Sequence, residues 1–223
     1  MNIEQLQNQM VVSCQAQNDH PLNHPDILAR LALCAEKAGA VAIRADHPVN
    51  IKEIKKVSSL PVIGIYKVPT KIEGRYFITP TFEHAEKIVE AGADIVAIEA
   101  TFEYQPDDEA FKRLLTRIQT ELKVPVMADV STLKEGERAW KFGAELVATT
   151  LSGYTKDSKN QPRPDFPLLE SLALKGIRTV CEGHIRTPSE AKKALEHGAY
   201  FVVVGTAITD PVSITSWFVE ACQ

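Results

Sequence analysis

The sequence has few of the features of secreted or membrane proteins. It contains only four cysteines, Cys14, Cys34, Cys181 and Cys222, without a Cys-X-X-Cys motif or paired spacing, so no disulfide framework is expected. The first nine residues are polar and lack a basic segment followed by an apolar run, which argues against a secretory leader. No apolar stretch approaches the roughly 20 residues that cross a bilayer. These absences predict a reduced protein of the cytoplasm with no membrane partner.

Excess positive charge is also lacking. The formal net charge is -4, whereas broad nucleic-acid binding needs a basic stripe, so no nucleic-acid partner is expected. A local cluster of Arg and Lys can still bind a small anion. With 44% hydrophobic and 24% charged residues, the composition is that of an ordinary globular protein, and a single domain over residues 1–223 is expected.

What the sequence does have is a repeated pattern. Four times, a helical segment ends in Gly-Ala and continues at once into an apolar strand. The four units are Glu36–Ala45, Val89–Ala100, Lys141–Thr150 and Glu196–Ala207. Their glycines recur at nearly even intervals and are expected to end each helix in the left-handed conformation.

Between these units lie four more apolar runs, which are typical of strands covered on both faces of a parallel sheet. They are Met10–Gln15, Leu60–Lys67, Val124–Ser131 and Ile177–Gly183. Thr132 and Thr187 begin capping boxes, and Asp165 and Asp210 are candidate N-caps. Eight strands alternating with helices predict a (β/α)8 TIM barrel. The alternative is an open doubly wound sheet, but the even spacing and the lack of a Gly-X-Gly-X-X-Gly motif favour closure.

In a TIM barrel the chemistry lies at the C-terminal ends of the strands. The predicted ends are Gln15, Arg44, Lys67, Glu99, Asp129, Thr149–Thr150, Glu182 and Gly205. A charged group that ends an apolar strand costs desolvation energy unless it is paired. A ring of such groups at one mouth therefore indicates function more than stability.

Lys67 and Glu182 are the predicted catalytic pair, because two-face proton exchange at one carbon needs a base on one side and an acid on the other. Their strands stand nearly opposite in an eight-strand ring. Free lysine titrates near 10.4, so Lys67 needs burial or a cationic neighbour such as Arg44 to act as a base. The alternative for Lys67 is a lysine that extends into solvent, and the alternative for Glu182 is a structural ion pair with a lysine.

Two further strand ends allow more than one role. Asp129 either takes part in catalysis, caps the following turn or anchors Lys67. Arg44 either forms a structural pair with Glu99 or holds a substrate hydroxyl or phosphate through its forked donors.

A phosphate site is expected in the loops after strands 7 and 8, where TIM barrels commonly bind phosphate through backbone N–H groups. Gly183 and the Gly205–Thr206 turn have the small residues that this requires, and His184 and Arg186 would add positive charge. Two other strand ends, Gln15 and Thr150, are expected to hydrogen-bond a substrate.

No metal site is expected. His20 and His24 stand near Asp19 and Asp26, which superficially resembles a metal-binding cluster. All four lie in one proline-containing segment, which favours a polar loop over a metal site.

Several segments carry a resemblance to the bacterial N-acetylmannosamine-6-phosphate 2-epimerases, and their order along the chain is the same. They are Val12–Ala16, Ile43–Ala45, Pro61–Lys67, Ile78–Thr81, Met127–Thr132, Thr149–Thr155, Glu182–Ile185 and Val204–Thr209. The Gln-Ala, Asp-Val-Ser-Thr and Leu-Ser-Gly-Tyr-Thr motifs are specific to that family rather than to barrels in general.

The resemblance implies a cytoplasmic enzyme of sialic acid breakdown that interconverts N-acetylmannosamine 6-phosphate and N-acetylglucosamine 6-phosphate without metal or cofactor. It assigns Lys67 as base and Glu182 as acid, with Arg44 and Asp129 holding and polarising the substrate. It also favours a homodimer. Trp217 and Phe218, in the last predicted helix, would pack either on the barrel or on a partner.

The chain departs from the family pattern at two cationic positions. Asp210 stands where the family usually has arginine, and His184 where it more often has arginine or lysine. Either Arg186 or another residue compensates, or the requirement for phosphate is relaxed. Another phosphosugar barrel enzyme, such as a metal-dependent pentulose phosphate epimerase, and a non-catalytic sugar-phosphate binding barrel remain as alternatives.

Overall fold

The chain folds into a closed barrel of parallel strands, as predicted. The computed structural model describes residues 2–16, 19–70, 75–159 and 164–223. The barrel strands are β1 (Met10–Cys14), β2 (Ala42–Asp46), β3 (Val62–Ile65), β6 (Ile95–Glu99), β7 (Val126–Asp129), β8 (Leu146–Ala148), β9 (Thr179–Glu182) and β10 (Phe201–Val204). Their order around the ring is β1-β10-β9-β8-β7-β6-β3-β2, so the first and last strands close the barrel. The (β/α)8 prediction is confirmed.

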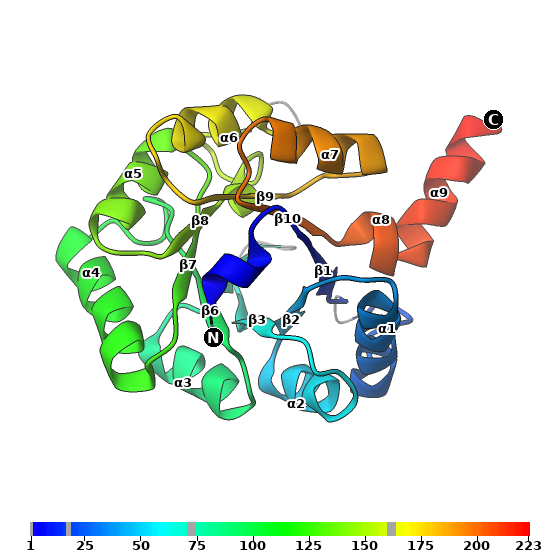
Figure 1. The fold of residues 1–223 in the computed structure, drawn as a ribbon, viewed down its shortest axis with the longest axis horizontal. Helices are drawn as coiled ribbons and strands as arrows, with labels where there is room; N and C mark the ends of the chain where they lie inside the picture. Colours follow the sequence, from blue (N-terminus) through cyan, green and yellow to red (C-terminus); the bar gives the residue numbers. More distant parts are fainter. Residues whose placement is uncertain (1, 17–18, 71–74, 160–163) are drawn as a thin grey trace.

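Helices surround the strands (Figure 1). They are α1 (Pro25–Lys37), α2 (Pro48–Val57), α3 (Phe82–Glu90), α4 (Asp108–Arg117), α5 (Leu133–Lys141), α6 (Phe166–Ala173), α7 (Pro188–Glu196), α8 (Thr206–Thr209) and α9 (Pro211–Ala221), with the short 3-10 helices η1 (Ile3–Leu6) and η3 (Thr149–Leu151) and the π-helix η2 (Ile118–Leu122).

The predicted helix boundaries are confirmed. The four repeat glycines, Gly39, Gly92, Gly143 and Gly198, have φ angles between 91° and 108° and follow the ends of α1, α3, α5 and α7. Thr132 and Thr187 form complete capping boxes. Asp165 and Asp210 accept hydrogen bonds from the first turns of α6 and α9.

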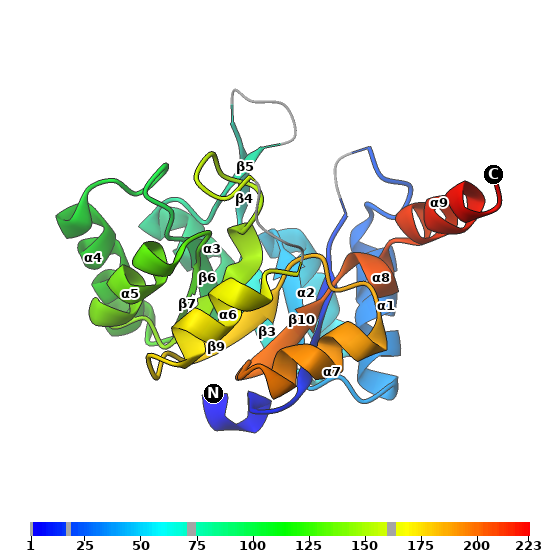
Figure 2. The same cartoon turned by 90° about the horizontal axis from the view of Figure 1, so that it is seen from above.

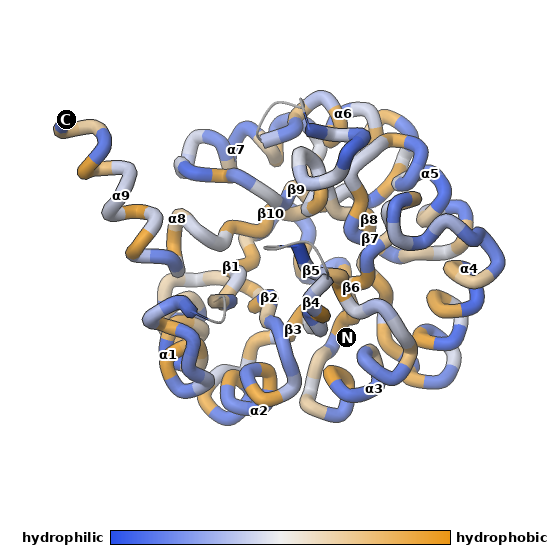
Figure 3. The backbone as a smooth tube through the Cα atoms, turned by 180° about the vertical axis from the view of Figure 1, so that it is seen from behind, coloured by the Kyte–Doolittle hydropathy of each residue, from blue (hydrophilic) through white to orange (hydrophobic). Residues whose placement is uncertain are grey.

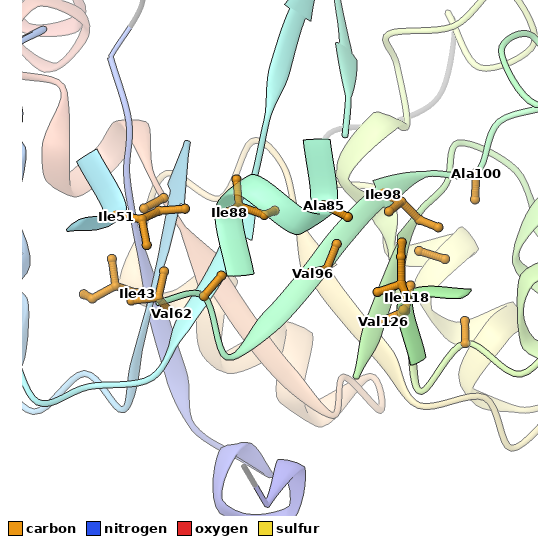
Figure 4. Close-up of a cluster of buried hydrophobic side chains, with 14 of the residues drawn as sticks. Ile43, Ile51, Val62, Ala85, Ile88, Val96, Ile98, Ala100, Ile118 and Val126 are labelled. Atoms are coloured by element: carbon orange, nitrogen blue, oxygen red, sulfur yellow. The ribbon is translucent and has the colours of Figure 1, made fainter. Parts of the chain in front are cut away.

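The core has two layers because alternate strand residues point inward and outward. Outward residues pack against the helices, and Figure 4 shows Ile43, Val62 and Val96 among α2 and α3 side chains such as Ile51 and Ile88. Inward residues fill the barrel itself; they include Ile63, Ile95, Met127, Leu146, Val180 and Phe201. Figure 3 shows the corresponding apolar strands within a ring of helices of mixed hydropathy. The interior of the barrel is therefore a packed scaffold.

A short antiparallel hairpin interrupts the repeat after the third barrel strand. It consists of β4 (Lys67–Pro69) and β5 (Tyr76–Ile78), with Lys67 opposite Ile78, and it rises from the barrel end opposite the N terminus (Figure 2). The prediction that one strand runs from Leu60 to Lys67 is wrong, because β3 ends at Ile65. The next residue, Tyr66, bonds with Thr79 instead of with the neighbouring barrel strand: its N–H donates to the Thr79 hydroxyl, and its carbonyl accepts from the Thr79 N–H.

The last helix leaves the barrel. Figures 1 and 2 show α9 projecting away from the ring of helices, and none of its residues is buried. In the described part of the chain, no helix has the length and apolar character that crossing a membrane requires.

Candidate active site

A cavity of about 600 Å³ opens at the C-terminal ends of the strands. Nearly all the predicted site residues line it, although they come from six different βα loops or strand ends. They are Gln15, Arg44, Lys67, Thr150, Glu182, Gly183, His184, Arg186, Gly205 and Thr206. Asp129 is the one predicted site residue that does not line the cavity. The structure thus brings the predicted strand-end residues together around one cavity.

A buried arginine organises the floor of the cavity. Arg44, whose side chain is 1% exposed, pairs with Asp129 through bonds of 3.1 and 2.5 Å and also with Glu182. The Thr150 hydroxyl donates to Asp129 over 2.7 Å. The suggested pairing of Arg44 with Glu99 is wrong, because Glu99 accepts from Arg75 instead. Asp129 does not line the cavity, and none of these hydrogen bonds joins it to Lys67. Its position is that of an anchor for Arg44 and Thr150.

Lys67 reaches the cavity from the first residue of the hairpin. Its backbone N–H donates to the Asp46 carboxylate over 2.9 Å, which fixes the chain as it leaves the barrel. Its Nζ lies 6.0 Å from the centre of the Tyr76 ring. Burial lowers the pKa of the Lys67 ammonium, Asp46 opposes that effect, and the positive charge of Arg44 adds to it. The cationic neighbour expected from the sequence is therefore present.

Glu182 ends β9, directly across the ring from β3. Burial raises the pKa of its carboxyl group to about 7, against the opposing effect of Arg44 and with that of Asp129. Its side chain is 12% exposed. Lys67 and Glu182 therefore face one cavity from opposite walls, with pKa values shifted toward each other.

The wall formed after β9 and β10 has the character of an anion site. Gly183 has a φ of 107° and His184 a φ of 59°, so two consecutive residues are left-handed, and the His184 ring stacks on Tyr154 with centroids 5.2 Å apart. The Arg186 guanidinium lies 4.8 Å from the Trp217 ring. Among the described residues Arg186 is in no ion pair, so its charge is available to a ligand.

Asp210, the residue that departs from the family pattern, is occupied by its own surroundings. Its carboxylate accepts from the Ser213 N–H over 3.0 Å and the Ser213 hydroxyl over 2.7 Å, and it pairs with His20 Nε2 over 3.1 Å. Burial would raise the pKa of Asp210, but these bonds hold it below its usual value. Asp210 therefore caps α9 as a carboxylate and supplies no positive charge to the cavity.

The cavity also contains groups with less distinct roles. Gln15 lines it and donates to the Ser13 hydroxyl over 2.8 Å. Over residues 2–16, 19–70, 75–159 and 164–223, no group of three or more His, Cys, Asp or Glu side chains is arranged to hold a metal ion. His20 of the suspected cluster is instead the partner of Asp210.

Sequence reasoning missed the residues that the hairpin and the last helix contribute. Arg75, directly before β5, and Tyr76, its first residue, line the cavity. Trp217 lines it from α9. The aromatic and β-branched run Tyr76–Ile78 was a strand signal. Nothing in it indicated, however, that the strand would pair with Lys67–Pro69 and bring its residues to the cavity.

Comparison with known proteins agrees with the geometry. A family model described as "Putative N-acetylmannosamine-6-phosphate epimerase" matches residues 28–223. A protein of Caldanaerobacter subterraneus subsp. tengcongensis, described as a 2-epimerase of this kind, is 51% identical over 220 residues, covering 97% of this chain and 92% of the relative. A relative from Clostridium perfringens strain SM101 is 42% identical over 219 residues, covering 98% of each chain.

A solved structure shows the same likeness in three dimensions. The N-acetylmannosamine-6-phosphate 2-epimerase from Clostridium perfringens superimposes with a TM-score of 0.90 at 41% identity, over 99% of this chain and 96% of that one. With both sequence and structure alike over nearly the full length, the chain belongs to the N-acetylmannosamine-6-phosphate 2-epimerase family.

Proposed function

We propose that the protein interconverts N-acetylmannosamine 6-phosphate and N-acetylglucosamine 6-phosphate by moving a proton at C2, with Lys67 and Glu182 as the catalytic pair. The observation that carries the proposal is the placement of these two groups on opposite walls of one cavity. Burial favours a neutral amine at Lys67 and a protonated carboxyl at Glu182. These are the forms that a base and an acid need.

The chemistry follows from the position of C2. In the open-chain sugar, C2 is next to the aldehyde, so removal of its proton by Lys67 Nζ gives an enolate. The Arg44 guanidinium lies on the cavity wall beside Glu182 and stabilises the negative charge that develops. Glu182 then delivers a proton to the opposite face of C2. Lys67 gains one proton and Glu182 loses one, so the protons balance. The sequence of steps therefore requires neither redox cofactor nor metal.

The direct test is hydrogen exchange at C2, followed by NMR in deuterium oxide. The wild-type protein should incorporate deuterium at C2 of N-acetylmannosamine 6-phosphate and form the epimer. Lys67→Met should abolish both exchange and epimerisation. Absence of exchange in the wild type would overturn the assignment.

Glu182→Gln provides a matched variant that separates the two half-reactions. It keeps the size of the side chain and one acceptor oxygen but lacks the acidic proton. We expect it to exchange the C2 hydrogen that faces Lys67 while forming no epimer. Equal loss of exchange and epimerisation in this variant would contradict the separate roles.

We also propose that Arg186 binds the 6-phosphate, in place of the family arginine that Asp210 replaces. The support is that Arg186 lines the cavity without an ion-pair partner among the described residues and lies beside the turns at Gly183 and Gly205. Arg186→Ala should raise KM for the phosphorylated sugar by about 10- to 100-fold, as expected for a charge-assisted hydrogen bond. An unchanged KM would exclude Arg186 and favour a relaxed phosphate requirement.

We infer further that one catalytic domain spans residues 1–223 and that the protein acts in the cytoplasm. The closed barrel uses both the first and the last strands, which supports a single domain. All four cysteines are free thiols, which suits a reducing compartment.

A homodimer is proposed on the surface of the last helix. Phe218 is 70% exposed on α9, and an apolar groove next to α8 is lined by Met10, Val12, Leu31 and Ile208 among others. Exposed apolar surface of this kind typically marks an interface. In the proposed dimer, α9 of each copy covers apolar surface on the other.

A further inference from the structure

The cavity contains a second arginine that the proposed chemistry does not use. Arg75, immediately before β5, is 14% exposed and lines the cavity beside Tyr76 and Ile78. Among the described residues its guanidinium donates to the Tyr76 carbonyl over 3.2 Å and to the Glu99 carboxylate over 2.6 Å. Because a guanidinium carries five N–H donors in a fixed fork, others remain for a ligand.

Glu99 is built to hold that arginine. It ends β6, its side chain is fully buried, and it also accepts from the Thr101 hydroxyl over 2.8 Å and from the Ile78 N–H over 3.4 Å. Burial raises the pKa of Glu99, and Arg75 opposes that rise. A buried ion pair is weak evidence for stability, because apolar residues of similar volume often serve as well. The pair instead fixes the position of the guanidinium over the cavity.

The charge balance distinguishes Arg75 from Arg186. Arg186 has no ion-pair partner among the described residues, so it suits an anion. Arg75 is already neutralised by Glu99, so it suits an uncharged acceptor such as an amide carbonyl. The two arginines therefore mark chemically different ends of the cavity.

The proposed function sets which part of the sugar meets each end. With the phosphate at Arg186 and C2 between Glu182 and Lys67, the groups beyond C2 extend past Lys67 toward the hairpin. The acetamido substituent of C2 is one of these groups. The wall there combines the Arg75 donors with the apolar side chain of Ile78, which matches an acetamido carbonyl beside its methyl group.

We propose that Arg75 binds the carbonyl oxygen of the 2-acetamido group and thereby determines specificity for it, with Glu99 as the positioning residue. This inference rests on the proposed function of the site. It makes the hairpin, which lies outside the eight-strand repeat, the source of selectivity at C2.

The test compares two ligands that differ only at C2. Mannose 6-phosphate has a hydroxyl where N-acetylmannosamine 6-phosphate has the acetamido group. Arg75→Met should raise KM for the acetamido sugar by about 10- to 100-fold. The inhibition constant of mannose 6-phosphate should change less than about threefold, because that ligand never makes the contact.

Matched variants separate recognition from structure. Glu99→Gln still accepts from Arg75 and should shift the KM less than Arg75→Met does, whereas Glu99→Met removes the anchor and should approach the Arg75→Met value. Arg75→Lys keeps the positive charge at this position. Thermal unfolding, followed by circular dichroism, establishes that each variant is folded.

The outcomes distinguish this inference from the proposed function. If the wild-type protein exchanges no hydrogen at C2 of N-acetylmannosamine 6-phosphate, the proposed function itself fails. If the wild type is active and Arg75→Met weakens both ligands by the same factor, Arg75 only supports the hairpin and the specificity proposal is wrong. A selective loss for the acetamido sugar supports it.

Discussion

Lys67 and Glu182 form one titrating unit at the centre of the site. Conversion in one direction needs neutral Lys67 with protonated Glu182, and the reverse direction needs the opposite arrangement. Both active forms hold a single proton between the two groups. Activity is therefore lost at low pH, where both groups are protonated, and at high pH, where neither is.

We accordingly expect a bell-shaped pH profile of kcat/KM for each direction. One limb should lie near the value of about 7 to which burial raises the pKa of Glu182, and the Lys67 limb should lie below the usual lysine value of about 10.4. In Glu182→Gln, C2 hydrogen exchange depends on neutral Lys67 alone, so its rate should only rise with pH. A falling alkaline limb in that variant would contradict the assignment.

Arg44 contributes to stability in a way that Lys67 does not. It is buried against two carboxylates, so Arg44→Met leaves Asp129 without its cation and should cost about 3–5 kcal/mol in the free energy of unfolding. Lys67→Met removes a group whose charged form burial already disfavours, and it should cost less than about 1 kcal/mol. Urea unfolding measures both, and equal losses would contradict the central role of Arg44.

At the scale of elements, two capping boxes with the same sequence signature differ in what they hold. Glu190 is partly exposed and accepts from the Thr187 and Arg186 N–H groups. Glu135 is 1% exposed and accepts from Thr132, from both Ser131 donors and from the Phe102 N–H. The second box therefore joins α5 to the loop after β6 as well as capping a helix.

The two boxes should respond differently to the same substitution. Glu135→Ala leaves several buried donors unpaired and should cost about 2–4 kcal/mol, whereas Glu190→Ala should cost about 0.5–1 kcal/mol. The unfolding midpoints in urea provide the comparison. Similar losses would mean that the buried donors find other partners.

The same contrast shows how far the sequence predicts this molecule. Local signals such as Gly-Ala helix ends, N-caps and apolar runs depend on neighbouring residues, and they located the barrel and its mouth. The partner of Arg44 and the hairpin that carries Arg75 depend on contacts between distant strands. No local pattern encodes those contacts, so the pairing of Arg44 with Glu99 stood as an open alternative and Arg75 was missed.

At the scale of the whole molecule, the exposed α9 leads to a prediction about mass. If the proposed dimer forms, light scattering should give twice the chain mass of 24.6 kDa, and Phe218→Asp should reduce it to the monomer. Leu174→Asp is the control, because Leu174 is an apolar residue that is 89% exposed at the end of α6, outside α9 and the apolar groove. A wild-type monomer at micromolar concentration would exclude the interface.

The closure of the ring by β1 and β10 has a consequence for synthesis on the ribosome. β1 pairs with β10 as well as with β2, so one edge of β1 has no partner until the last strand has been translated. Unpaired edges of this kind favour aggregation. A nascent chain that stalls before Phe201 cannot close its barrel, and it should depend on chaperones until translation resumes.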